Sequence, residues 1–175
     1  MDGSPSKPNL LERIIHRISG NAPDTAEGVL ALLQQAHEQQ AFDADTMQRL
    51  EKVLDFAELE VRDAMITRSQ MSVVKAGDSL ERIIPYIIET AHSRFPVIGR
   101  DVDDVMGIVH LRRAIGVPYE RRADVPVAST SLMTPAPRVP ETMPLANLLV
   151  ELRAQGSQMA IVVDEYGGTA GVVTL

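Results

Sequence analysis

An internal repeat is the feature that most limits what this 175-residue chain can fold into. Four stretches in its second part have counterparts further along, each displaced by 64 to 68 residues. The matched stretches are residues 65–67 with 133–135, Leu80 with Leu145, 94–98 with 159–163, and 107–110 with 171–174. A nearly constant displacement over four separate elements predicts two copies of one structural unit.

Each copy has the pattern of a short strand, a helix and two further strands. In the first copy a helix is expected to open at Asp78 or Ser79, and Pro85 should kink it or shift its start. In the second copy Pro144 suits the first helical position and Gly156 suits the C-cap.

Two largely apolar runs, 94–98 and 159–164, predict buried strands. Gly167 and Gly168 predict a hairpin turn that leads into a last strand, 171–175. The expected fold class is therefore α/β (α+β): a tandem pair of units whose small three-stranded sheets are flanked by helices.

An all-helical N-terminal arm is expected at residues 9–58, after a disordered leader at 1–8. Its first helix has Leu10, Leu11, Ile14, Ile15 and Ile18 on one face. Asp24 and Glu27 have the spacing of a capping box for a second helix, and a third is expected after Asp43.

Composition excludes several classes of function. The chain has no cysteine, which removes disulfides and thiolate metal sites, and its net charge of −7 would repel nucleic acid. The one dense basic stretch, with Arg112, Arg113, Arg121 and Arg122, is interpreted as a solvated face. No apolar run reaches about 20 residues, so no direct membrane span is expected and the chain is placed in the cytoplasm.

Residues 61–71, 92–98, 159–168 and 171–174 resemble the motifs of tandem CBS domains in the CorC/HlyC family, soluble branch, which is associated with magnesium and cobalt efflux. The resemblance covers residues 42–175. It implies CBS domain 1 at 59–122 and CBS domain 2 at 123–175. The second copy ends without the helix that should follow, so the chain is expected to be truncated at its C-terminus.

The resemblance also implies two clefts, each able to hold an adenine nucleotide, and pairing of the chain into a homodimer. A Gly-h-h-Thr-x-x-Asp run, where h is an apolar residue, supplies the Thr for phosphate and the Asp for ribose. Thr174 matches the Thr, whereas the Asp would fall at position 177. In the first copy His110 and Arg113 replace the two polar residues.

The favoured nucleotide site consists of Thr134, Pro135, Ala160, Ile161 and Thr174, with Arg68 as a phosphate partner. The weaker candidates for the first cleft are Ile66, Phe95, His110 and Arg113. Each residue also has a structural interpretation. Thr174 can be a strand residue, Arg68 a surface cation, Phe95 and Ala160 core residues, and His110 a hydrogen-bonded histidine rather than a metal ligand. The Asp101, Asp103 and Asp104 group is interpreted as a solvated turn rather than a cation site.

No metal site and no catalytic site are predicted. The phosphate-binding loop and the nucleophile elbow are absent, and Ala41 stands where a zinc-protease motif beginning at His37 needs its second histidine.

The expected function is a regulatory module for magnesium and cobalt homeostasis that binds AMP or ATP, with or without Mg²⁺. A membrane transport protein is a candidate partner. The alternative is a structural dimerisation module with empty clefts, and an enzyme is a third, weaker hypothesis.

Overall fold

The structure is a computed structural model that describes residues 25–175. The leader, the helix expected through Leu10 and Ile18, and the capping residue Asp24 lie outside the described residues. The chain divides into two compact units, one up to Asp55 and one from Phe56 to Leu175, and each is described by itself.

The described part of the first unit is helical, as the arm was expected to be. Helix α2 spans Ala26–Glu38, and its N-cap is Thr25, whose side-chain oxygen accepts a hydrogen bond from the backbone N–H of Gly28 at 3.2 Å. Helix α3 spans Ala44–Glu58 and follows Asp43, as predicted.

The second unit contains both copies of the repeat. The first copy comprises α4 (Val61–Ala64), β1 (Ile66–Thr67), the 3-10 helix η1 (Arg68–Gln70), β2 (Val74–Lys75), α5 (Leu80–Thr90), β3 (Arg94–Ile98), β4 (Val105–His110), α6 (Leu111–Ile115) and a second 3-10 helix, η2 (Tyr119–Arg121). The second copy comprises β5 (Met133–Thr134), β6 (Arg138–Pro140), α7 (Leu145–Ala154), β7 (Met159–Val163) and β8 (Thr169–Thr174). The predicted α/β class and the repeated order of elements are confirmed.

The two copies exchange their first strands. One sheet has the order β2-β3-β4-β5 and the other the order β1-β8-β7-β6. Ile66 of β1 lies opposite Val172 of β8, and Thr134 of β5 lies opposite Ile108 of β4, both in antiparallel pairs. Each sheet therefore has four strands rather than the expected three, because a two-residue strand from the other copy is added at one edge.

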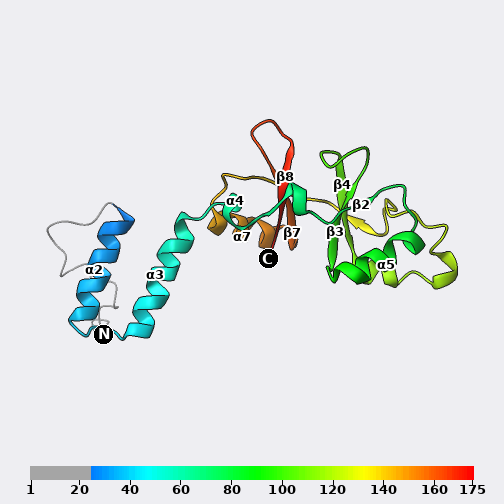
Figure 1. Ribbon diagram of the computed structural model, residues 1–175. Coiled ribbons are helices and arrows are strands. Elements are labelled where there is room, and N and C mark those ends of the chain that lie inside the picture. Colours follow the sequence, from blue (N-terminus) through cyan, green and yellow to red (C-terminus); the bar gives the residue numbers. More distant parts are fainter. Residues whose placement is uncertain (1–24) are drawn as a thin grey trace, which may run out of the picture. The chain divides into compact units, whose positions relative to one another are not determined.

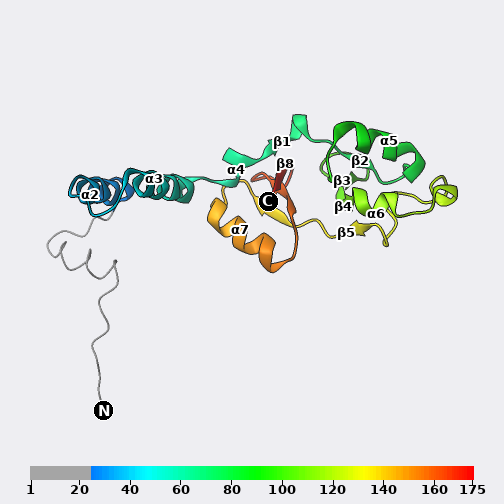
Figure 2. The same cartoon turned by 90° about the horizontal axis from the view of Figure 1, so that it is seen from below.

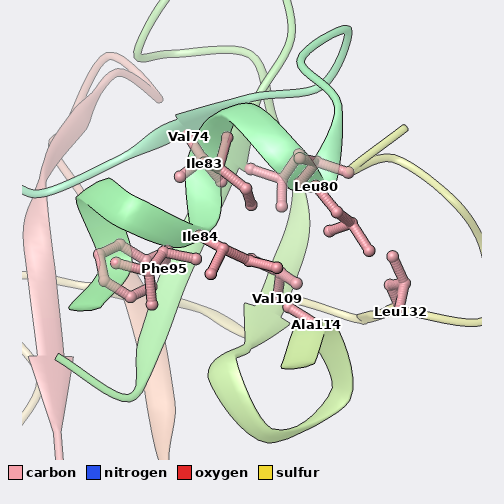
Figure 3. Close-up of a cluster of buried hydrophobic side chains, with 11 residues drawn as sticks. Val74, Leu80, Ile83, Ile84, Phe95, Val109, Ala114 and Leu132 are labelled. Carbon is pink, nitrogen blue, oxygen red and sulfur yellow. The ribbon is translucent and has the colours of Figure 1, made fainter. Parts of the chain in front are cut away.

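Two hydrophobic cores lie under the helices, one for each sheet. The first core packs α5 and α6 against β2, β3 and β4 (Figure 3). It consists of Val74, Leu80, Ile83, Ile84, Ile87, Phe95, Val97, Val109, Ala114, Val127 and Leu132. The second core packs α7 against β6, β7 and β8 and consists of Val61, Val139, Leu145, Leu148, Leu152, Ala160, Val162 and Val173.

The exchange between the two copies also involves residues of the hydrophobic cores. Val61, at the start of the first copy, is fully buried in the second core. Val127 and Leu132, which precede the second copy, are buried in the first core. The segment leading into each copy therefore packs with the other copy, so both sheets depend on both halves of the repeat.

The helix ends lie within a residue or so of the positions predicted from the sequence. Helix α5 begins at Leu80 and runs through Pro85, so proline does not shift its start. Pro144 is the N-cap of α7 rather than its first helical residue. Gly156 follows the C-cap of α7 with a φ of 61°, a left-handed conformation that favours glycine.

Both faces of the central strands are buried. Along each strand, the residues that alternate with the core residues point to the opposite face. On that face Ile98, Ile108, Ile161 and Val172 are at most 6 % exposed. Both views show the two sheets side by side, with α5 and α7 on their outer sides (Figures 1 and 2).

Candidate functional site

A pocket of about 500 Å³ lies where the two copies meet, and we call it the inter-repeat pocket. Its lining residues are Arg94, Ile108, His110, Arg112, Arg113, Thr134, Pro135, Pro137, Gln155, Gly156, Ser157 and Gln158. They come from β3, from the junction of β4 and α6, from β5 and the loop after it, and from the loop between α7 and β7. This volume is in the range of small-molecule sites.

His110 joins a strand to a helix at this pocket. It is the last residue of β4 and the N-cap of α6, and its Nδ1 accepts a hydrogen bond from the backbone N–H of Arg112 at 2.9 Å. Burial lowers the pKa of His110, and the nearby charges of Arg94, Arg112 and Arg113 lower it further. The neutral ring therefore has its proton on Nε2, which leaves an N–H group free to donate.

Positive charge surrounds the histidine. Arg94 of β3 donates a hydrogen bond to the side-chain oxygen of Gln158, which precedes β7 in the other copy. Arg112 and Arg113 lie in the first turn of α6. Among the described residues, those that line the pocket include no aspartate and no glutamate. The pocket is therefore suited to an anion.

The rest of the lining is apolar or uncharged. Ile108, Pro135 and Pro137 offer flat apolar surface. The hydroxyl group of Thr134 donates to the backbone carbonyl of Ile108 at 3.3 Å, so its oxygen lone pairs remain available to accept. A flat ring carrying an anionic group matches this combination of surfaces.

The structure brings together residues that the sequence assigned to separate clefts. Thr134 and Pro135 were grouped with Thr174, but they line the inter-repeat pocket beside His110 and Arg113. The physical reason is the strand exchange, because β5 pairs with β4 of the first copy and not with a strand of its own copy.

Three candidate residues have fully buried side chains. Ala160 belongs to the second core and Phe95 to the first, each with 0 % exposure. Ile161 of β7 is also 0 % exposed. In this structure their side chains are packed inside the protein and do not line the inter-repeat pocket.

At the other sheet, Ile66 and Thr174 match Thr134 and His110 in the repeat, whereas Arg68 lies toward the opposite end of β8, at Thr169. Ile66 of β1 pairs with β8, and Thr174 is the exposed last residue of β8. Arg68 is not free there. Its guanidinium pairs with Asp103 and donates to the backbone carbonyl of Thr169 at 3.1 Å.

The pairing of Asp103 with Arg68 is a contact that sequence reasoning missed. The aspartates between β3 and β4 form a turn, in which Asp101 accepts a hydrogen bond from the backbone N–H of Asp103 at 2.9 Å. This agrees with the turn interpretation, but the partner of Asp103 across the repeat had no signal in the sequence. Within the described residues no group of three His, Cys, Asp or Glu side chains is placed to hold a metal ion.

Arg94, Arg112 and Gln158 were also missed as pocket residues. Arg94 was interpreted as the start of a buried strand, and Arg112 as part of a solvated basic face. A signal existed for Arg112, since it lies two residues after the Gly-h-h-His run that ends β4.

The chain matches two family models. The CBS domain model matches residues 61–119 and 128–175, and the model called N-terminal region of NMB0537 matches residues 21–56. Among curated proteins, the chain is 36 % identical over 170 residues to the magnesium and cobalt efflux protein CorC of Salmonella typhimurium strain LT2. That match covers 97 % of this chain and 58 % of the relative, so the chain spans little more than half the length of CorC.

Two solved structures resemble it closely. A conserved domain of unknown function from Neisseria meningitidis MC58 is 57 % identical with a TM-score of 0.70, covering 85 % of this chain and 95 % of that one. The CBS domain of the bacterial CNNM/CorC family Mg²⁺ transporter, in complex with ATP, is 36 % identical with a TM-score of 0.67, covering 71 % and 87 %. The chain belongs to the CorC family of tandem CBS-domain proteins, as its motifs indicated.

Among residues 25–175, no helix is both long and apolar enough to cross a bilayer.

Proposed function

We propose that this chain is a regulatory module that binds an adenine nucleotide between its two CBS copies and thereby serves magnesium and cobalt homeostasis. The observation that supports this most directly is the inter-repeat pocket, which combines arginine, histidine and threonine side chains with an apolar wall. Guanidinium groups bind phosphate, and a flat apolar surface accepts an adenine ring.

The relatives support the same ligand class. The CBS domain of the CNNM/CorC Mg²⁺ transporter has been solved with ATP, and the Salmonella relative is named for magnesium and cobalt efflux. The Salmonella relative is named as an efflux protein, and the CNNM/CorC domain as part of a transporter. AMP and ATP are therefore the first ligands to test.

Regulation follows from where the ligand would sit. A nucleotide in the pocket contacts residues of both copies, so it binds best to one relative packing of the two and shifts the population toward it. We propose a membrane transport protein, contacted from the cytoplasmic side, as the partner that responds. A homodimer formed through the CBS pair belongs to the same proposal.

The second cleft remains a candidate site of the same kind. Thr174, Ile66 and Arg68 are its proposed polar and apolar contacts. For nucleotide to reach Arg68 there, a phosphate group must compete with Asp103, which now occupies the guanidinium.

Isothermal titration of the whole chain with AMP, ADP and ATP tests the proposal. Arg113→Ala should weaken binding at the inter-repeat pocket, whereas Thr174→Val should weaken binding only at the second cleft. Arg121→Ala is the matched control, because Arg121 is an exposed arginine of η2 that does not line the pocket. If no adenine nucleotide binds at any concentration up to millimolar, the chain is a structural dimerisation module with empty clefts.

A further inference from the structure

His110 is the one residue of the inter-repeat pocket, among those described, whose charge can change near neutral pH. The other lining residues are arginines, which stay charged, and residues without an ionisable side chain. The Gly-h-h-Thr pattern has a threonine at this position, so the histidine is a departure of the first copy from that pattern. The pocket therefore contains a titratable group that the pattern does not provide.

Three arginines surround this histidine, and they come from two elements. Arg94 of β3 lies directly opposite His110 of β4 in the antiparallel pair, a position in which two like charges destabilise each other. Arg112 and Arg113 follow His110 in α6. The strand β5, the loop after it and the loop between α7 and β7 contribute only uncharged residues to the lining. Within the described part of the chain, no carboxylate in the pocket offsets a positive charge on His110.

The cap of α6 also keeps the ring neutral. Nδ1 of His110 accepts a hydrogen bond from the backbone N–H of Arg112 at 2.9 Å. A proton on Nδ1 would remove that acceptor, because a protonated imidazole has two donors and no acceptor. Burial and the three arginines act in the same direction and lower the pKa of His110 below its usual 6.5. Without an anion in the pocket, the histidine is therefore neutral at neutral pH.

We propose that the pocket couples anion binding to proton uptake: an anion held by the arginines brings a proton onto His110, so mild acid strengthens its binding. The proton comes from solvent and adds to Nδ1, and the hydrogen bond from the backbone N–H of Arg112 is lost. The same coupling applies to any anion that reaches the arginines. The inference rests on the proposed function and adds a form of regulation to the same site.

The coupling follows from charge. An anion beside the three arginines offsets the positive potential that opposes protonation, and it accepts a hydrogen bond from the protonated ring. The pKa of His110 is therefore higher with an anion bound than without one. Thermodynamic linkage makes the effect reciprocal, so protonation raises the affinity for the anion by the same factor. Binding becomes about tenfold tighter for each unit by which the pKa rises, at a pH below both pKa values.

Proton nuclear magnetic resonance of the whole chain measures the pKa of His110 directly. The ring C–H resonance is followed from about pH 5 to about pH 8, where histidine titrates, in buffer alone, with AMP and with sodium sulfate, at constant ionic strength. Sulfate is included because its charge is constant over this range, whereas the phosphate of AMP titrates near about pH 6. The spectrum of His110→Thr identifies the resonance by its absence.

We expect saturating sulfate or AMP to raise the pKa of His110, and sulfate to bind about tenfold tighter at about pH 5.5 than at about pH 8. In His110→Thr, the affinity for sulfate should not depend on pH. His37 and His92 are internal controls in the same sample, because neither lines the pocket, and their pKa values should not change. If His110→Thr shows no melting transition, His110→Asn, which also supplies a favourable N-cap, replaces it.

Two results would overturn the inference while the proposed function stands. One is an unchanged pKa of His110 with AMP bound, and the other is sulfate binding with the same affinity at both pH values. If sulfate raises the pKa and no adenine nucleotide binds, the proton coupling stands and the adenine part of the proposed function fails. If neither anion changes the His110 resonance at any pH, the inference and the proposed site both fail.

Discussion

Arg68 and Asp103 form a two-point ion pair between residues that are 35 positions apart in the sequence. The same carboxylate of Asp103 accepts a hydrogen bond from the backbone N–H of Thr169 at 2.7 Å. Asp103 lies in the turn between β3 and β4, and Thr169 begins β8. Arg68 also donates to the backbone carbonyl of Thr169, so the ion pair, through Thr169, links the β3–β4 hairpin of the first copy to the β7–β8 hairpin of the second.

Replacing Asp103 by Asn tests this link through its pH dependence. The hydrogen bond from Arg68 lowers the pKa of Asp103 from its usual 3.8 to about 2, and the backbone N–H of Thr169 contributes to the lowering. A carboxyl whose pKa is lower in the folded state stabilises the fold fully above the unfolded value, near pH 4, and loses this effect as the pH falls toward 2.

We expect Asp103→Asn to melt a few degrees below the parent at most, since exposed ion pairs contribute little, and this gap should close between pH 4 and pH 2. Melting curves at several pH values measure it. Asp45→Asn, which breaks the exposed pair with Arg49 within α3, is the control and should show a smaller gap. A gap of the same size at pH 7 and pH 2 would contradict the assignment.

Replacing His110 by Thr should remove a loss of stability in mild acid. Burial and three arginines hold the pKa of His110 below its usual 6.5, so the folded state disfavours the proton. The parent should therefore lose stability as the pH falls below about 6.5, as protonation of Nδ1 breaks the cap on Arg112. Thr does not titrate, and it is a favourable N-cap residue.

His110→Ala loses the cap at neutral pH and should lower the free energy of unfolding by about 1 kcal/mol. Equal acid sensitivity in the parent and in His110→Thr would disprove this role.

Truncating Phe95 should show that it is a core residue and does not line a ligand-binding cleft. Its side chain is 0 % exposed and packs in the first core. Phe95→Ala should lower the free energy of unfolding by about 3 to 5 kcal/mol in urea titrations. Ile88→Ala changes a residue of α5 that is 62 % exposed and should cost less than about 1 kcal/mol. If Phe95→Ala changes the free energy of unfolding only slightly, the ring lines an open cleft instead of packing in the core.

Replacing Gly171 by Ala should weaken the pairing of β1 with β8. A Cβ atom at Gly171 would overlap the backbone carbonyl oxygen of Ile66, the neighbouring residue in β1. Gly171→Ala should therefore destabilise the protein by about 2 kcal/mol and speed amide hydrogen exchange in β1 and β8. Gly77→Ala is the matched control, because nothing lies within 4 Å of its added Cβ. Unchanged exchange in Gly171→Ala would mean that β1 does not depend on this close approach.

The repeat predicted most of the fold. Its constant displacement located α5 with α7, β3 with β7, and β4 with β8, because each of these elements has an apolar pattern of its own. The exchange of β1 and β5 had no such pattern. A two-residue strand is too short for its periodicity to show, and nothing local specifies its partner.

In the candidate site, too, residues with a local sequence pattern were predicted and contacts made only by the tertiary fold were not. His110 and Arg113 were found from their position in a motif, which is a local property. Thr134 was assigned to the wrong neighbours because its partner Ile108 is specified by sheet topology, and Asp103 was missed because it contacts Arg68 only through the tertiary fold.

The exchange of first strands also constrains the order in which this protein can be completed during synthesis. The sheet that holds Ile66 cannot close until Val172 has left the ribosome, although β1 is made long before β8. The short segment 66–67 must therefore remain unpaired while residues 68–171 emerge. Pairing over such a sequence separation is slow, because the intervening loop has to close first. Neither copy can complete its sheet before the other has been made, and β1 is paired only once β8 is available.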